Sequence, residues 1–103
     1  MQTLSPGDFR ALMESGATIV DVRMPEELEL ARLPGAVAIP LPQLASRLGE
    51  LDPEAPVGLL CHHGVRSELA ARLLERNGFK SVAHLEGGID AWSQAIDPSV
   101  PRY

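Results

Sequence analysis

The sequence predicts an α/β fold, a small sandwich in which a central, mainly parallel sheet carries helices on both faces. Two observations lead to this prediction. Short apolar and β-branched runs, typical of buried strands, occur at residues 18–22, 57–61 and 81–85. Amphipathic segments typical of helices lie before, between and after them, so strand and helix alternate along the chain. Such alternation is typical of parallel strands joined by right-handed crossovers.

In the first half of the chain, a helix is expected over residues 6–15, ahead of the strand at 18–22. A short helix is expected over residues 26–31. The dipeptide Pro34-Gly35 then predicts a turn that leads into a short strand at residues 37–39.

Prolines and leucines define the next helix, which is expected over residues 42–51. Pro40 and Pro42 stand at its start and Asp52-Pro53 at its end. Its leucines follow helical spacing on one face, which predicts that this face packs on the sheet. They are Leu44, Leu48 and Leu51.

The last two helices are expected over residues 65–77 and 89–95. Asn77-Gly78 is a typical stop signal for the first of them, and an apolar stripe is expected along that helix. The residues of this stripe are Leu69, Leu73 and Leu74. Trp92 follows Ile89 by three residues on the apolar face of the final helix, so we expect it in the core.

Length and composition indicate one domain. The chain has 103 residues, and its hydrophobic content of 45% is enough for a single core. We expect residues 1–95 to form this domain. Residues 96–103 contain two prolines and no periodic pattern, which predicts an extended C-terminal tail packed on or near the domain.

Charge and hydropathy exclude two classes of partner. The net charge is −5, from 14 acidic and 9 basic residues, which argues against a nucleic-acid partner. No apolar run reaches the length of about 18 residues that a membrane span needs, and the first residues lack the basic and apolar regions of a signal peptide. We therefore expect no membrane partner and a cytoplasmic location.

The candidate site is the segment 61–67, Cys-His-His-Gly-Val-Arg-Ser, which holds the only cysteine of the chain. Cys61 comes at the carboxyl end of a predicted strand, where open α/β sheets bind their ligands. The segment then forms a tight loop into the next helix, so its amide N–H groups are expected to face inward and bind an anion. Gly64 can adopt the positive φ that such a loop needs.

The same amides and the helix dipole stabilise a thiolate, and cysteines at helix N-termini have lowered pKa values. We therefore predict that Cys61 is a nucleophile at neutral pH. Arg66 offers a planar set of donors to an oxyanion such as a sulfate, sulfonate or phosphate group, and Ser67 is expected to cap the helix. We assign substrate binding to the loop residues, namely His62, His63, Gly64, Val65, Arg66 and Ser67.

Several other polar residues are interpreted as structural. We expect Asp21 and Arg23 to pair with loop amides or with a neighbouring charge, and His84 to be a satisfied, partly buried histidine. No metal site is predicted, because the adjacent His62 and His63 are expected to point in different directions.

Four segments of the chain resemble the rhodanese family in its single-domain form. They are the loop at 61–67, Asp21-Val22-Arg23 followed by Glu26 or Glu27, the turn Leu33-Pro34-Gly35-Ala36, and residues 85–92. Their order matches the family, and together they cover nearly the whole chain. The resemblance implies the rhodanese-like α/β sandwich.

The resemblance also implies a sulfurtransferase. Cys61 would take sulfane sulfur from thiosulfate or a protein persulfide, carry it as a persulfide, and pass it to cyanide, a thiol or a protein. No cofactor is implied, because the cysteine itself carries the sulfur. This chain has His62 where many family members have a basic residue directly after the cysteine, which argues against a preference for thiosulfate and leaves a protein persulfide as the alternative donor.

Two alternatives share the same fold. A rhodanese-like module could bind a partner without turnover, although non-catalytic relatives often lack the cysteine. A related phosphatase or arsenate reductase would use the same thiolate. Related phosphatases place five residues between the cysteine and the arginine, whereas four separate Cys61 from Arg66, which favours sulfur chemistry.

Overall fold

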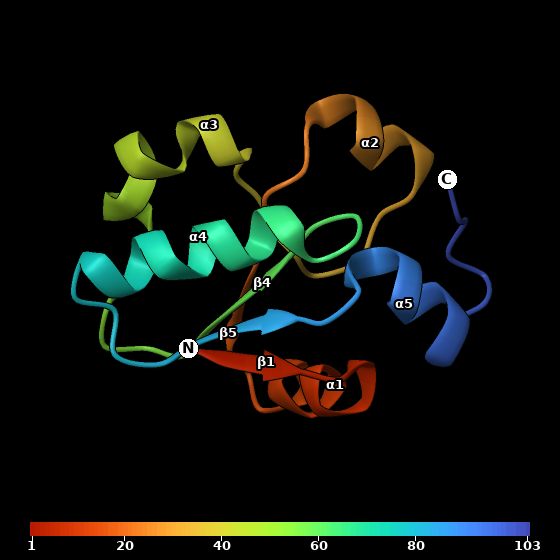
Figure 1. Ribbon diagram of the computed structural model, residues 1–103, viewed down its shortest axis with the longest axis horizontal. Helices are drawn as coiled ribbons and strands as arrows, with labels where there is room; N and C mark the ends of the chain where they lie inside the picture. Colours follow the sequence, from red (N-terminus) through yellow and green to blue (C-terminus); the bar gives the residue numbers. More distant parts are fainter.

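The fold is an α/β sandwich built on one parallel sheet, shown by the computed structural model of residues 1–103 (Figure 1). The sheet has five strands in the order β1-β5-β4-β2-β3, and every neighbouring pair is parallel. The predicted fold class is thus confirmed. The elements are β1 (Gln2–Leu4), α1 (Pro6–Glu14), β2 (Thr18–Asp21), α2 (Pro25–Leu30), β3 (Val37–Ala38), α3 (Leu41–Leu44), the 3₁₀ helix η1 (Ala45–Glu50), β4 (Val57–Leu60), α4 (Val65–Arg76), β5 (Val82–Leu85) and α5 (Gly88–Ala95).

The sheet carries an apolar cluster on each face. Side chains alternate along a strand, so Leu59 of β4 belongs to the cluster under α3 and α4, while Leu60 belongs to the cluster under α1 and α5. Figure 1 shows α3 and α4 on one side of the sheet and α1 on the other. Trp92 lies in the second cluster, 6.5 Å from the ring of Phe9, which confirms its expected place in the core.

Strand β1 was not predicted from the sequence. It is only three residues long and contains Gln2 and Thr3, so it lacks an apolar pattern. It forms the edge of the sheet beside β5, with Thr3 in register with His84. The strand is held by its pairing with β5 and by Leu4, which packs against the apolar cluster under α1 and α5.

The expected helix over residues 42–51 is instead a short α-helix, α3, followed by the 3₁₀ helix η1. The hydroxyl of Ser46 donates to the carbonyl of Gln43 at 2.9 Å, and such a side-chain bond competes with the regular helical pattern. The predicted packing face is correct, since Leu44 and Leu51 are buried and Leu48 packs against the same cluster.

The expected apolar stripe of α4 is wrong in one position. Leu69 is 55% exposed, whereas the buried positions follow Ser67 at helical spacing. They are Ala70, Ala71 and Leu74. Short alanine side chains let the helix backbone approach the sheet closely, so small residues, rather than leucines alone, define the face of α4 that packs.

Gly88, the first residue of α5, lies against the segment that follows β4. Gly88 has φ +63°, and a Cβ atom on it would lie 2.4 Å from the carbonyl oxygen of His62 and 2.5 Å from that of Cys61. The N–H groups of Ile89 and Asp90 donate to the same two carbonyls, at 2.8 and 3.2 Å. The segment 61–62 is therefore fixed by main-chain bonds from the first turn of α5.

None of the helices combines the length and the hydrophobicity that crossing a membrane requires. The cytoplasmic location stays a prediction.

Gly88→Ala should destabilise the protein by about 2 to 5 kcal/mol, because it adds both backbone strain and a clash with main-chain atoms. Urea unfolding measures this loss. Gly16→Ala is the matched control, since Gly16 also has positive φ, +90°, but open space around its Cβ position. It should lose only about 1 to 2 kcal/mol. Equal losses for the two variants would contradict the close packing of the two turns.

Candidate active site

Cys61 directly follows β4 and is almost fully buried, with 1% of its surface exposed. The loop then turns sharply at Gly64, whose φ is +103°, and α4 begins at Val65. A Cβ atom at position 64 would also lie 3.2 Å from the main-chain nitrogen of Gly87. The expected need for glycine at this position is confirmed, because it has both positive φ and a close main-chain neighbour.

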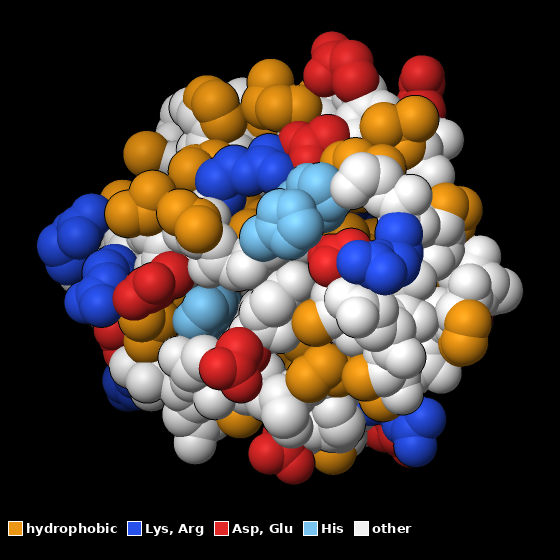
Figure 2. Space-filling view, turned by 45° about the vertical axis from the view of Figure 1, so that its right-hand side comes forward, with side chains coloured by type: hydrophobic (Ala, Val, Ile, Leu, Met, Phe, Trp, Pro, Cys, Tyr) orange, Lys and Arg blue, Asp and Glu red, His pale blue; other side chains and the backbone are white.

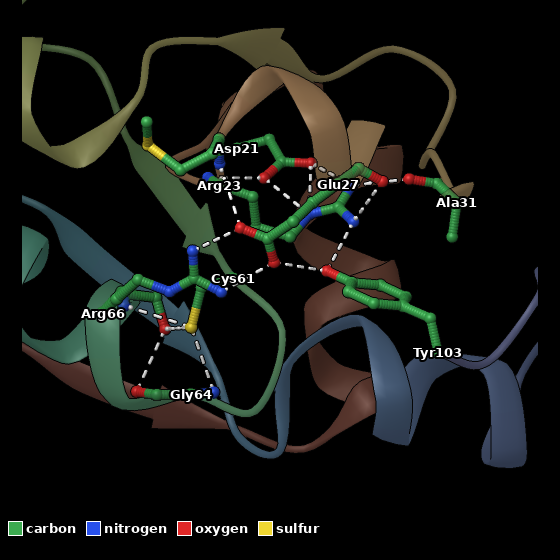
Figure 3. Close-up of polar contacts among 10 residues, drawn as sticks. Asp21, Arg23, Glu27, Ala31, Cys61, Gly64, Arg66 and Tyr103 are labelled. Atoms are coloured by element: carbon green, nitrogen blue, oxygen red, sulfur yellow. Dashed lines mark hydrogen bonds and ion pairs between the residues drawn. The ribbon is translucent and has the colours of Figure 1, made fainter. Parts of the chain in front are cut away.

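Amide groups of the loop point at the sulfur atom. The N–H of Gly64 donates to Cys61 Sγ at 3.0 Å, and the N–H of Ser67 donates to it at 3.3 Å. The thiol donates to the hydroxyl oxygen of Ser67 at 3.5 Å. Figure 3 shows these contacts around the sulfur. The inward-facing amides expected from the sequence are present, and they can stabilise negative charge on the sulfur.

Arg66 does not present its guanidinium group freely to a ligand. It forms a bidentate ion pair with Glu27 of α2, with N–O distances of 2.5 and 2.8 Å (Figure 3). The hydrogen bonds from Arg66, helped by one from Tyr103, lower the pKa of Glu27 to about 2. Glu27 is therefore a carboxylate at neutral pH and neutralises the charge of Arg66.

Tyr103 covers the same ion pair from the C-terminal segment. Its hydroxyl donates to Glu27 at 2.6 Å and accepts from Arg23 at 3.0 Å. Burial, with the bond to Glu27, raises the pKa of Tyr103 to about 12. Its ring stacks on the ring of His62 at 3.8 Å. We call Glu27, His62, Arg66 and Tyr103 the roof of the site.

The roof closes the site from outside. Neither surface pocket of the structure includes Cys61. On the face shown in Figure 2, histidine, arginine and acidic side chains lie side by side among apolar ones. A donor or acceptor must therefore displace part of the roof to reach the sulfur.

Asp21 and Arg23 form a buried ion pair that supports α2, as expected for structural residues. Arg23 donates to Asp21 at 2.7 Å and to the carbonyl of Ala31 at 2.8 Å, and both charged side chains are buried. The carbonyl of Glu27 accepts a weaker bond from Arg23 at 3.4 Å. The pair thus ties the middle of α2 and the residue that follows it to the end of β2.

The remaining loop residues differ in their surroundings. The rings of His62 and His63 lie 3.8 Å apart, so the expectation that they point in different directions is wrong; the stacking of His62 on Tyr103 draws the rings to one side. The side chain of Val65 is in solvent, with 70% exposure. His84 is buried and satisfied, since its two ring nitrogens contact Ser67 and Thr3, as expected.

Two residues of the roof were not assigned to the site from the sequence. Glu27 carried a signal, because it follows Asp21-Val22-Arg23 at a position that the resemblance singled out. Tyr103 carried none, since it lies outside every motif and reaches the site only because the tail folds back. Ser93 and Val100 hold that tail through a hydrogen bond of the Ser93 hydroxyl to the Val100 carbonyl.

A parallel α/β sheet with a cysteine held by amides between a strand end and a helix defines a class of α/β proteins with a cysteine-containing loop. Within this class, the chain belongs to the rhodanese family. The model of the rhodanese-like domain matches residues 5–95, so the expected family is confirmed.

Two curated relatives support the assignment. The chain is 43% identical over 91 residues to the rhodanese-like/PpiC domain-containing protein 12, chloroplastic, of Arabidopsis thaliana; the match covers 84% of this chain but only 30% of that protein. It is 33% identical over 91 residues to the thiosulfate sulfurtransferase GlpE of Pseudomonas aeruginosa, covering 88% of this chain and 83% of that enzyme.

A solved structure has the same fold. The rhodanese-related protein of Thermoplasma volcanium superposes with a TM-score of 0.83 and 27% identity, covering 98% of this chain and 96% of that one. The similarity extends through nearly the whole chain.

The pKa of Glu27 predicts an acid-sensitive contribution to stability. Its folded value of about 2 lies below the ordinary 4.5, so the contribution is complete above pH 4.5 and is lost as the pH falls toward 2. Glu27→Gln should lower the free energy of unfolding at pH 7 by about 1 to 2 kcal/mol and flatten its fall in acid. Urea unfolding at pH 7 and at pH 3 measures both effects.

Glu14→Gln is the control for this prediction, because Glu14 pairs with Arg10 at the exposed surface, at 3.5 Å. It should change the free energy of unfolding by less than about 0.5 kcal/mol. An acid profile of Glu27→Gln that matches the unmodified protein would contradict the assigned ion pair.

Proposed function

We propose that this protein is a sulfurtransferase that carries sulfane sulfur as a persulfide on Cys61. The observation that carries the proposal is the sulfur atom of Cys61, which accepts N–H bonds from Gly64 and Ser67 at the end of β4. The presence of a thiosulfate sulfurtransferase among relatives that match most of this chain supports the same chemistry.

The reaction has two steps. The thiolate of Cys61 attacks the outer sulfur of the donor, and the bond from that sulfur to the rest of the donor breaks; sulfite, or the donor thiolate, leaves with the electron pair. The acceptor, which is cyanide, a thiol or a protein thiolate, then attacks the outer sulfur of the Cys61 persulfide and releases the thiolate. Transfer through a covalent intermediate predicts ping-pong kinetics.

The loop amides suit both steps. Negative charge stays on a sulfur atom of residue 61 before and after the transfer, and the N–H groups of Gly64 and Ser67 are already oriented toward it. Donors fixed in advance stabilise developing charge without reorganisation. His62, His63, Val65 and Arg66 surround the entrance, where they would contact the donor once the roof opens.

The roof favours a persulfide donor over thiosulfate. Thiosulfate presents a charged oxyanion, and Arg66 is the cation of the loop, but its guanidinium is already bound by Glu27. Thiosulfate must therefore displace a carboxylate that stays charged at neutral pH. A persulfide must also open the roof, but it needs no oxyanion site and so does not have to take the Arg66 guanidinium from Glu27.

The persulfide can be detected by mass. Incubation with thiosulfate or with the persulfide of a small thiol should add one sulfur atom to the unmodified protein and none to Cys61→Ser, and later addition of cyanide should restore the original mass. Equal masses for the two proteins would overturn the proposal. Hydrolysis of an aryl phosphate that is lost in Cys61→Ser would assign the thiolate to phosphatase chemistry instead.

The preference between donors can be tested at Glu27. Glu27→Gln removes the competing charge, so kcat/KM for thiosulfate should rise about tenfold, equivalent to about 1.4 kcal/mol, while kcat/KM for a small persulfide should change little. Glu26→Gln is the matched control, since Glu26 lies in the same turn and is exposed. An equal effect of Glu27→Gln on both donors would contradict the role of the Arg66–Glu27 pair.

A further inference from the structure

A line of polar side chains runs from the sulfur of Cys61 to the edge of the sheet. The hydroxyl of Ser67 lies 3.5 Å from Sγ and 3.0 Å from Nδ1 of His84. Nε2 of His84 lies 3.1 Å from the hydroxyl of Thr3. The line joins three elements, α4, β5 and β1, through contacts between residues far apart in the sequence.

These polar groups occupy positions that normally hold apolar residues. Ser67 is fully buried on the face of α4 that packs on the sheet, beside Ala70 and Ala71. His84 is 5% exposed and follows Val82 by two residues on the same face of β5. Buried polar side chains cost free energy unless each finds a partner, and here each one does.

The proton on His84 determines to which acceptor the Ser67 hydroxyl donates. The Ser67 hydroxyl has one proton and three neighbours, namely Sγ of Cys61, the carbonyl oxygen of Gly64 at 3.2 Å, and Nδ1 of His84. If Nδ1 lacks a proton, the Ser67 hydroxyl donates to Nδ1 and cannot donate to Sγ. If Nδ1 carries the proton, it donates to the serine oxygen, and the hydroxyl proton is left for Sγ or the Gly64 carbonyl. Of these two acceptors, a negatively charged sulfur is the stronger.

We propose that His84 is a positioning residue: as a neutral imidazole protonated on Nδ1, it holds the Ser67 hydroxyl as a third hydrogen-bond donor to the negatively charged sulfur of Cys61. In this tautomer Nε2 is an acceptor, and the Thr3 hydroxyl, 3.1 Å away, can donate to it. For a persulfide on Cys61 the inference rests on the proposed function, whereas for the free thiolate of Cys61 it does not depend on that proposal.

His84 acts as a neutral group rather than as a base. Burial lowers its pKa, and the more distant Glu68 and Glu86 raise it only in part. A proton taken from the thiol would place an imidazolium inside the core without a paired carboxylate, which is costly. The neutral ring, by contrast, can donate from one nitrogen and accept at the other.

The charged groups near this line lie on three segments, and any titration must account for them. They are Arg66, Glu68 and Arg72 of α4, Glu86 after β5, and Glu27 of α2, which pairs with Arg66. None of them contacts His84 in a hydrogen bond. The variants below leave all five unchanged.

The thiolate can be titrated directly, because the chain has one cysteine and a thiolate absorbs in the ultraviolet. The signal of Cys61→Ser serves as the baseline. Ser67→Ala removes the third donor, and His84→Leu removes the N–H that fixes the Ser67 oxygen, so that the hydroxyl can turn to the Gly64 carbonyl instead. In both variants the midpoint of the titration should move up by about one pH unit, the value of one hydrogen bond to a charged group. His84→Asn retains an N–H at the place of Nδ1 and should restore the midpoint.

A purely structural role predicts a different pattern. His84→Leu fills the core as well as histidine does, so its midpoint would then equal that of the unmodified protein, and this result would overturn the proposal. Nitrogen NMR of the unmodified protein gives a second reading that does not depend on any variant. It should find the proton of His84 on Nδ1 at pH 8, and a proton on Nε2 would overturn the proposal.

These measurements need no sulfur donor. A protein that fails to form a persulfide but shows the predicted titration would refute the proposed function alone. A protein that forms the persulfide but shows a Ser67→Ala midpoint equal to the unmodified one would refute the role of His84 alone.

Discussion

The cysteine loop depends on the main-chain hydrogen bonds that α5 makes to it. The N–H groups of Ile89 and Asp90 hold the carbonyls of Cys61 and His62, and this approach is close enough that only glycine fits at position 88. With its carbonyls fixed in this way, the loop has its amides free to turn toward the sulfur. Two turns from distant parts of the chain, each shaped by glycine, thus define one site.

The electrostatics of the site follow from the pairing of each arginine with a carboxylate. Every strong cation near the sulfur has a carboxylate partner: Arg66 is bound by Glu27 and Arg23 by Asp21. Negative charge on the sulfur is therefore stabilised by uncharged N–H and O–H donors at short range rather than by a free cation. Such a site attracts dianions weakly from solution, which agrees with the preference proposed for a persulfide donor.

The sequence alone predicted the sheet, its helices and the cysteine loop, because apolar periodicity and glycine-containing turns are local signals. It did not predict β1, whose three residues have no apolar pattern, or the buried stripe of α4, where alanines rather than Leu69 make the contact. Tyr103 and the Arg66–Glu27 pair were missed for another reason. Both depend on which segments the fold brings together, and no spacing along the chain encodes that.

Strand β1 can open locally because it lies at the edge of the sheet. It has three residues, and edge strands of this length open locally at a lower free energy than the strands in the middle of a sheet. Each opening would take the Thr3 hydroxyl away from His84 while β4, β5 and the cysteine loop stayed closed. The reactivity of the sulfur would then vary with the fraying of a strand that never touches it.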